Sequence, residues 1–377
     1  MQTPDRFLPV QRLLDARVEE GRIPGYAAAV RHAGRTELLV GGRRHLDGDQ
    51  PMTADTQFRL ASVSKPFAGV LTLQLVEDGV LALDDEIVRW LPEFAEPRVL
   101  RALEAELDDT VPAERPITVR DLLTNTPGFG GIWTPCPLAD ALEATGGEPG
   151  GFPPTVEPDE LLRRLGGLPL AAQPGERWLY HVATDVLSVL LARASGRSLS
   201  ALLAEGVCEP LGLTGTGFTG DPGRLATQYQ PGDDGLCVLD AADGRFARPP
   251  VFEGLAAGLV STAPDVLTVF AALADGGVPL LRPASAAAMT TDQLTDAQKE
   301  RSADELDGGS TTWGYQVGVH LSGRPLGAGA WGWDGGTGTS AWADPSRDVI
   351  GVLLTQRLMS GPDDAADWFW AAAADCL

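Results

Sequence analysis

The chain has 377 residues, of which 44% are hydrophobic, so it can bury the core of one large domain or of two closely packed lobes. Its formal net charge of −23 excludes nucleic acids and anionic membranes as partners, because phosphate groups are bound by clustered Lys and Arg. No uninterrupted apolar stretch approaches about 18 residues, and no transmembrane helix is therefore predicted.

The N-terminal segment shows no basic leader followed by an apolar run, and a helix is predicted over 5–20. We therefore expect a cytoplasmic protein. Four cysteines lie far apart and are predicted to be reduced core residues: Cys136, Cys208, Cys237 and Cys376. Neither they nor the four histidines have the spacing of metal ligands, so no metal or cofactor is expected.

Short β-type runs near both ends of the chain flank a middle that is mainly helical. Strands are predicted over 25–30 and 37–40, joined as a hairpin, and over 314–320, 326–331, 340–344 and 349–356, with a turn at 322–324. Helices are predicted over 63–76, 119–123, 158–165, 182–194, 199–206, 264–274 and 363–375. Segments rich in Pro and Gly, over 126–137, 146–158 and 220–250, are predicted to be loops around a cleft.

This order of elements favours an α+β fold. We expect an antiparallel sheet formed by both termini and flanked by helices, with a mainly helical lobe inserted. The chain, 1–377, would be a single catalytic unit. Its α/β lobe would comprise about 1–60 plus 305–377, and its helical lobe with the loops about 61–304.

Ser62 and Lys65 form the most informative motif. The chain has only two lysines, and unlike arginine a lysine can give up its proton near neutral pH. On a helix, Ser62 and Lys65 would lie one turn apart on the same face. The N–H group of Ser62 would then face a developing oxyanion at the positive end of the helix dipole. The alternative is a capping serine followed by a solvated lysine.

Five sequence blocks in order resemble the class C β-lactamase and penicillin-binding-protein superfamily. They are Phe58-Arg59-Leu60-Ala61-Ser62-Val63-Ser64-Lys65, Ile117 to Gly128, Gln173 to Tyr180, Gly258 to Asp265 and Gly332-Trp333-Asp334-Gly335-Gly336-Thr337. Within the superfamily, the chain is most similar to the family VIII carboxylesterases and related acyltransferases. The resemblance covers most of the chain and implies a β-lactamase/transpeptidase-like fold.

The resemblance also implies roles for individual residues. Ser62 would be the nucleophile that accepts the acyl group, Lys65 its activating base, and Tyr180 the relay that passes a proton to the leaving group. The backbone N–H groups of Ser62 and Gly336 would form the oxyanion hole. For Tyr180 the alternative is a buried aromatic residue at the start of a helix. Asn125 stands where relatives usually have histidine, and no role is assigned to it.

The sequence departs from the β-lactamase pattern at two places. The Tyr-x-Asn motif is replaced by Tyr180-His181-Val182, and an apolar Val182 near Lys65 would disfavour the ammonium form. The Lys-Thr-Gly motif is replaced by Trp333, Asp334 and Gly335, which are expected to bind substrate and to favour uncharged groups over anions. Alternatively, Trp333 only packs in the cleft and an arginine such as Arg324 or Arg347 supplies the positive charge.

The function predicted from these features is that of a serine carboxylesterase that cleaves small neutral esters through a Ser62 acyl-enzyme. One enzymatic alternative is a β-lactamase or D-amino-acid peptidase, which would prefer anionic amides. A second is an acyltransferase to an alcohol acceptor, and a non-enzymatic alternative is an inactive ligand-binding homologue. A small ester is the expected partner, with neither nucleic acid nor membrane, and the sequence does not indicate the oligomeric state.

Overall fold

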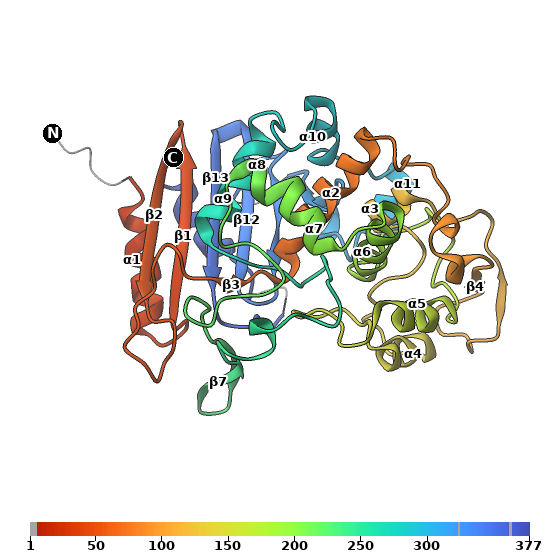
Figure 1. Ribbon diagram of the computed structural model, residues 1–377, viewed down its shortest axis with the longest axis horizontal. Helices are drawn as coiled ribbons and strands as arrows, with labels where there is room; N and C mark the ends of the chain where they lie inside the picture. The colour runs from red at the N-terminus through yellow and green to blue at the C-terminus, as the bar shows by residue number, and fades with distance from the viewer. Residues whose placement is uncertain (1–5, 323–324, 362–363) are drawn as a thin grey trace.

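The computed structural model describes residues 6–322, 325–361 and 364–377, and its main sheet is built from both ends of the chain (Figure 1). Seven antiparallel strands follow one another in the order β2-β1-β13-β12-β11-β10-β9. They are β1 (Gly25–His32), β2 (Arg35–Gly42), β9 (Thr311–Trp313), β10 (Gly318–His320), β11 (Trp331–Gly335), β12 (Thr339–Asp344) and β13 (Val349–Thr355). The predicted antiparallel sheet is confirmed.

Helices cover both faces of this sheet, which explains why Tyr26 to Val30 of strand β1 are all apolar and buried. Tyr26, Ala28 and Val30 pack with helices α1 (Leu8–Glu19) and α12 (Asp367–Ala374). Ala27 and Ala29 point to the opposite face and join the large core that includes helix α9 (Ala263–Ala274). Successive side chains of a strand alternate between faces, so a strand covered on both sides is apolar at every position.

The remaining helices form the mainly helical part beside the sheet (Figure 1). They are α2 (Lys65–Glu77), α3 (Val119–Leu123), α4 (Pro137–Thr145), α5 (Pro158–Gly166), α6 (Val182–Ser195), α7 (Leu199–Leu203), α8 (Glu209–Leu211), α10 (Pro283–Met289) and α11 (Asp296–Arg301). Small two-stranded sheets pair β3 (Phe58–Arg59) with β8 (Val260–Ser261), β4 (Arg98–Leu100) with β5 (Thr110–Pro112), and β6 (Gln228–Gly232) with β7 (Gly235–Asp240).

Several element boundaries near the C-terminus differ from the prediction. The strand predicted over 326–331 begins only at Trp331, because the Gly327 N–H donates to the Asp344 carboxylate and Gly329 has a φ of 83°, so the chain turns there. The strand predicted over 314–320 is confined to β10, since Gln316 has a φ of 66°. Residues 323–324 of the predicted turn lie outside the described residues.

Other elements of the structure were not predicted or begin at a different residue. The predicted loop over 220–250 contains the β6–β7 hairpin, and helices α4, α10 and α11 were not predicted. The first helix begins at Leu8, whereas residue 5 lies outside the described residues. The last helix begins at Asp367, and residue 363 of its predicted range is likewise not described.

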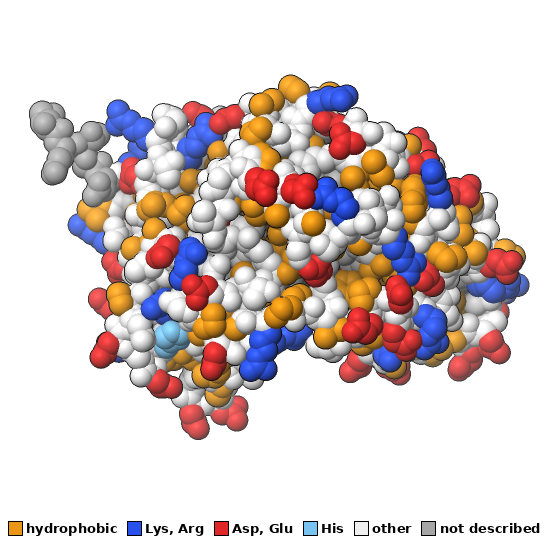
Figure 2. Space-filling view, in the orientation of Figure 1, with side chains coloured by type: hydrophobic (Ala, Val, Ile, Leu, Met, Phe, Trp, Pro, Cys, Tyr) orange, Lys and Arg blue, Asp and Glu red, His pale blue; other side chains and the backbone are white. Residues whose placement is uncertain are grey.

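The surface mixes charges of both signs. On the face drawn in Figure 2, Lys and Arg side chains are interspersed with Asp and Glu and form no extended basic area. Within the described residues, no single helix is both long and apolar enough to cross a membrane.

Candidate active site

A short turn of 3₁₀ helix, Ala61–Ser64, carries Ser62 and leads directly into α2. The prediction placed Ser62 in the first turn of an α-helix, but the α-helix begins at Lys65. Ala61 has a φ of 44°, which is unfavourable for a residue with a Cβ and redirects the chain just before Ser62. Pro66 fits the first turn of α2, where a backbone N–H is not needed inside the helix.

The β11–β12 hairpin holds the chain just before Ser62. The Thr337 hydroxyl donates to the Arg59 carbonyl at 2.6 Å, and the Thr339 hydroxyl donates to the Leu60 carbonyl at 2.8 Å. A Cβ atom on Gly335 would lie only 2.3 Å from the Leu60 carbonyl oxygen. Glycine is therefore required at this position for strand β11 to approach the nucleophile turn so closely.

Lys65 is completely buried and lies beside Ser62. Its Nζ is 3.0 Å from Ser62 Oγ and 3.2 Å from His181 Nδ1, and it donates to the Ala256 carbonyl at 2.8 Å. Burial lowers the pKa of Lys65 from its ordinary value to about 7, although the carboxylate of Asp185 acts to raise it. Burial thus favours the neutral amine, which is the form of a lysine that can accept a proton.

His181 lies beside Lys65, and no pattern in the sequence predicts a histidine there. It has φ 79° and ψ −66°, and the Val182 N–H donates to the Tyr180 carbonyl at 3.1 Å, so His181 is the central residue of a γ-turn. This strained backbone directs its ring to Lys65. Burial, followed by the charge of Lys65, lowers the pKa of His181 well below its usual value, so the ring is neutral.

Asp185 follows one turn later on α6 and supplies a buried carboxyl group. Its Oδ2 is 3.7 Å from His181 Nε2, and neither of its oxygens has a hydrogen-bond partner among the described residues. Burial raises the pKa of Asp185, and the charge of Lys65 partly opposes this increase. Lys65, His181 and Asp185 thus form a buried polar group in which each charge is destabilised by burial. The apolar Val182, predicted as the neighbour of Lys65, lies in the first turn of α6, and the polar contact of Lys65 comes from His181.

The structure brings Tyr180 to the same point as Ser62 and Lys65. Its hydroxyl accepts a hydrogen bond from Trp333 Nε1 at 2.6 Å, and its ring centroid is 4.6 Å from Lys65 Nζ. Burial raises the pKa of Tyr180 to about 12, while hydrogen bonds with Ser62 and Trp333 act in the opposite direction. The phenol thus keeps its proton at neutral pH.

Asn125 shapes the backbone that leads to Tyr180. It is fully buried with a φ of 56°, and its carbonyl accepts from the Leu179 N–H at 2.7 Å. The Tyr180 carbonyl accepts from the Gly131 N–H, also at 2.7 Å. The side-chain amide of Asn125 has no hydrogen-bond partner among the described residues. Asn125 therefore supports the segment next to the site through its backbone.

Aromatic residues form one wall of the site. Trp333 packs edge to face against Trp313 with ring centroids 4.7 Å apart, and Tyr180 stacks on Trp178 at 5.5 Å. Asp334 points away from Trp333, as expected for the next residue of a strand. Its carboxylate accepts hydrogen bonds from Ser340 and Trp342 on the neighbouring strand β12. Of the three predicted substrate-binding residues, Trp333 lies beside Tyr180, Gly335 lies against the nucleophile turn, and Asp334 faces β12.

The other residues named in the prediction are Gly336, Arg324 and Arg347. Gly336 directly follows β11, and its carbonyl accepts from the Met359 N–H at 2.8 Å. Arg324 lies outside the described residues, and Arg347 donates to the Pro325 carbonyl. In the described part of the chain, no three His, Cys, Asp or Glu side chains are grouped so as to hold a metal ion.

Comparisons with known proteins find relatives along most of the chain. The Beta-lactamase family model matches residues 10–375. Esterase EstB of Burkholderia gladioli is 34% identical over 93% of this chain and 91% of its own length. Protein Rv1367c of Mycobacterium tuberculosis is 38% identical over 86% of this chain and 83% of its own length.

A solved structure shows the same architecture over nearly the full length. It is EstCE1, described as a hydrolase with promiscuous acyltransferase activity, with a TM-score of 0.83 and 27% identity. The alignment covers 98% of this chain and 97% of that one. These similarities confirm the predicted fold. The sequence identity to Esterase EstB supports the predicted class of enzyme, a serine carboxylesterase. The chain belongs to the Beta-lactamase family.

Proposed function

We propose that this protein cleaves small, neutral carboxylic esters through an acyl-enzyme on Ser62. The observation that carries the proposal is the contact between Lys65 Nζ and Ser62 Oγ at 3.0 Å, with the lysine buried and its pKa lowered to about 7. A serine hydroxyl is a weak nucleophile until a base accepts its proton. Lys65 is close enough to be that base, and its burial makes the neutral form available.

In the first half-reaction, Ser62 Oγ attacks the ester carbonyl carbon while its proton moves to Lys65 Nζ. The carbonyl oxygen becomes an oxyanion, which the N–H groups of Ser62 and Gly336 stabilise. The ester C–O bond then breaks, and the departing alkoxide takes the phenolic proton of Tyr180. Lys65 returns its proton to the Tyr180 oxygen, which leaves an acyl-enzyme and a free alcohol.

In the second half-reaction, water takes the place of the alcohol. Its oxygen attacks the acyl carbon while one water proton moves to the Tyr180 oxygen and the phenolic proton of Tyr180 moves to neutral Lys65, and the same two N–H groups hold the oxyanion. Lys65 then gives its proton to Ser62 Oγ as the acyl C–O bond breaks. Ser62 Oγ leaves with a proton, so the carboxylic acid is released and the enzyme returns to its starting state. The high pKa of Tyr180 suits this role, because the phenol must hold a proton until an alkoxide needs it.

The preference for neutral esters rests on strand β11. β-Lactamases carry a lysine where this chain has Trp333, whose indole instead donates to Tyr180 at 2.6 Å and packs against Trp313. An anionic substrate would therefore find an aromatic surface where those enzymes offer a cation, and an uncharged acyl or alcohol group would lose less hydration there. The similarity to Esterase EstB supports the same choice of substrate class.

The test compares the hydrolysis of p-nitrophenyl acetate, butyrate and octanoate with that of nitrocefin, an anionic β-lactam. We expect turnover of the esters, slow or no cleavage of nitrocefin, and loss of ester turnover in Ser62→Ala. Ser340→Ala is the matched control, because this serine is also buried but bonds to Asp334 on the sheet. Faster cleavage of nitrocefin than of the esters would overturn the proposal in favour of a β-lactamase.

A second candidate is acyl transfer to an alcohol, which differs only in the molecule that deacylates Ser62. It is favoured by the described activity of EstCE1, a hydrolase that also transfers acyl groups. Adding a primary alcohol to the p-nitrophenyl butyrate reaction tests it. A new ester product, with faster release of p-nitrophenolate when deacylation limits the rate, would support transfer, whereas butyrate as the sole product would exclude it for that alcohol.

A further inference from the structure

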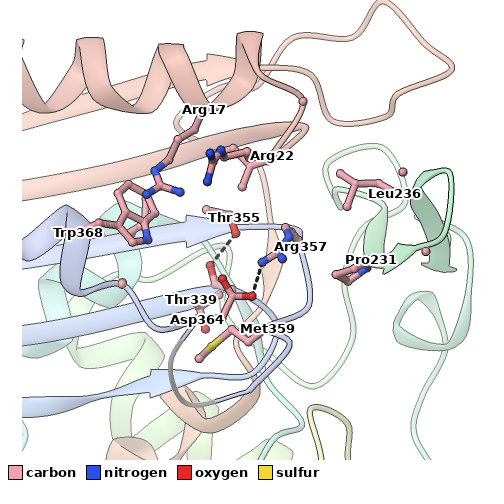
Figure 3. Close-up of a pocket in the computed structure, with 17 residues that line it drawn as sticks. Arg17, Arg22, Pro231, Leu236, Thr339, Thr355, Arg357, Met359, Asp364 and Trp368 are labelled. Atoms are coloured by element: carbon pink, nitrogen blue, oxygen red, sulfur yellow. Dashed lines mark hydrogen bonds and ion pairs between the residues drawn. The ribbon is translucent and has the colours of Figure 1, made fainter.

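A cavity lies on the sheet side of the molecule, between the end of α1, the β6–β7 hairpin and the C-terminal segment (Figure 3). Its volume is about 280 Å³, far above the roughly 10–15 Å³ that one water molecule needs. Neither Ser62, Lys65, Tyr180 nor Trp333 lines it. The cavity is therefore large enough for a small organic molecule, and the reaction proposed above does not use it.

The residues that line this cavity are mainly cationic among their charged members, although the chain as a whole carries a net charge of −23. Among the described residues, the cavity lining contains three arginines, Arg17, Arg22 and Arg357, and one carboxylate, Asp364, which together carry a net charge of two positive units. Arg357 is hydrogen-bonded to Asp364, and Arg22 forms an exposed ion pair with Glu20 at 2.7 Å. Figure 3 shows the three guanidinium groups around a common space.

Arg17 is the arginine that still lacks an anionic partner. None of the described carboxylates lies within ion-pair distance of it, and its Nε atom is buried without a hydrogen-bond partner. Its guanidinium lies over the ring of Trp368, 3.6 Å from the centroid, which fixes its orientation. Burial and the neighbouring charge of Arg22 lower the pKa of Arg17, so an added negative charge would be stabilised here.

Apolar side chains complete the lining. Pro231 and Leu236 belong to the β6–β7 hairpin, and the lining also includes Ile23, Leu353 and Met359. An inorganic anion could use the arginines but not these surfaces, whereas an organic acid would use both. Guanidinium groups bind carboxylates through two parallel hydrogen bonds, which matches the donors on offer.

We propose that this cavity is a binding site for a small organic carboxylate, with the acid group on Arg17 and Arg22 and the hydrocarbon part against Leu236 and Trp368. The site is independent of whether Ser62 hydrolyses esters. It is nevertheless close to the nucleophile turn, because Thr339 lines the cavity and also donates to the Leu60 carbonyl.

The experiment is isothermal titration calorimetry of the full chain with hexanoate, hexanamide and inorganic phosphate at low ionic strength. We expect saturable one-to-one binding of hexanoate, and little or no binding of the uncharged amide. Arg17→Gln and Arg22→Gln should each weaken hexanoate binding by about tenfold, the loss expected for a charge-assisted hydrogen bond. Arg12→Gln is the matched control, since Arg12 lies on the same helix but not in the cavity.

The outcomes separate this site from the proposed active site. Equal binding of hexanoate to the wild type, Arg17→Gln and Arg22→Gln would overturn the proposal, as would loss of binding in Ser62→Ala or Trp333→Phe alone. If phosphate binds as tightly as hexanoate, and loses affinity equally in both arginine variants, the assignment to an organic acid is overturned. Arg22 is exposed, so Arg22→Gln keeps the test valid if Arg17→Gln does not fold.

Discussion

The two lysines of this chain occupy opposite environments, and the contrast shows how one side chain can be either a base or a surface charge. Lys65 is fully buried beside Ser62, and burial lowers its pKa to about 7. Lys299 is partly exposed on α11 and lies 2.7 Å from a carboxylate oxygen of Asp292 and 3.0 Å from one of Asp296. Its hydrogen bond to Asp292 raises its pKa.

The difference lies in what surrounds each ammonium group. Around Lys65 the hydrogen-bond partners are a hydroxyl, a carbonyl and a neutral histidine, and the nearby carboxyl group of Asp185 is itself buried and hard to ionise. None of these fully compensates a positive charge that has lost its water. Lys299 keeps both water and carboxylates. A proton can therefore leave Lys65 near pH 7, whereas it stays on Lys299.

The sharpest test of this contrast is to remove each lysine in turn. Lys65→Met should lower kcat for p-nitrophenyl butyrate by about 10³-fold or more, since the loss of a general base typically costs 10²–10⁴-fold. Lys65→Arg should be equally inactive because arginine stays protonated. Lys299→Met should change kcat by less than about twofold, as expected for an exposed ion pair. Comparable losses in the two Met variants, both folded by circular dichroism, would contradict the contrast.

Tyr180→Phe sharpens the comparison by separating the base from the proton relay. An alkoxide needs a proton to leave but p-nitrophenolate does not, so the loss should reach about 10²-fold for ethyl butyrate and be smaller for p-nitrophenyl butyrate. Tyr229→Phe is the control, because the Tyr229 hydroxyl accepts from the Leu46 N–H away from Ser62. Equal losses on both esters would argue that Tyr180 only packs in the site.

Trp333→Lys restores a cation to the strand beside Ser62. It should raise the ratio of nitrocefin cleavage to p-nitrophenyl butyrate hydrolysis by about tenfold, because one charge-assisted hydrogen bond to the anion has an effect of this size. Trp333→Phe removes the indole N–H that bonds to Tyr180 without adding charge, and should lower kcat while leaving this ratio unchanged. If the ratio is the same in the two variants, the residue at position 333 does not determine the choice between anionic and neutral substrates.

The smallest effect is expected from Asp185→Asn. The charge of Asp185 raises the pKa of Lys65, so its removal should move the acid limb of the kcat/KM profile to lower pH. Asp159→Asn, which alters an exposed ion pair with Arg193, should leave the limb in place. A shift of the limb to higher pH would mean that Asp185 acts on Lys65 by a route other than its charge.

Local patterns in the sequence were enough to predict the main architecture and the chemical motif. Helix α3 has the predicted bounds, because Thr118 and Asp121 form a capping box at its start. Ser62 and Lys65 were recognisable because they lie three positions apart and lysine is rare in this chain. The roles of Ser62, Lys65, Tyr180 and Gly336, the lobe boundaries and the cytoplasmic location stay predictions.

Contacts between distant segments explain what the sequence did not reveal. His181 reaches Lys65 across 116 residues and only through an unusual γ-turn. The β6–β7 hairpin lies in a segment rich in Pro, Gly and Asp, and its Asp240 forms a buried ion pair with Arg59, the residue at the end of β3. Hydrophobic periodicity carries no signal for either contact, because each depends on a polar partner supplied by the folded chain.

The central claim is that burial makes Lys65 a neutral base for Ser62. The most direct measurement is the rate at which an uncharged fluorophosphonate labels Ser62 as a function of pH, followed by intact mass with Ser62→Ala as the blank. Because the neutral lysine is the reactive form, the rate should rise with pH through a midpoint near 7 and then level off. A rate that is flat from pH 5 to pH 10, or that rises only near the ordinary pKa of lysine, about 10.4, would contradict it.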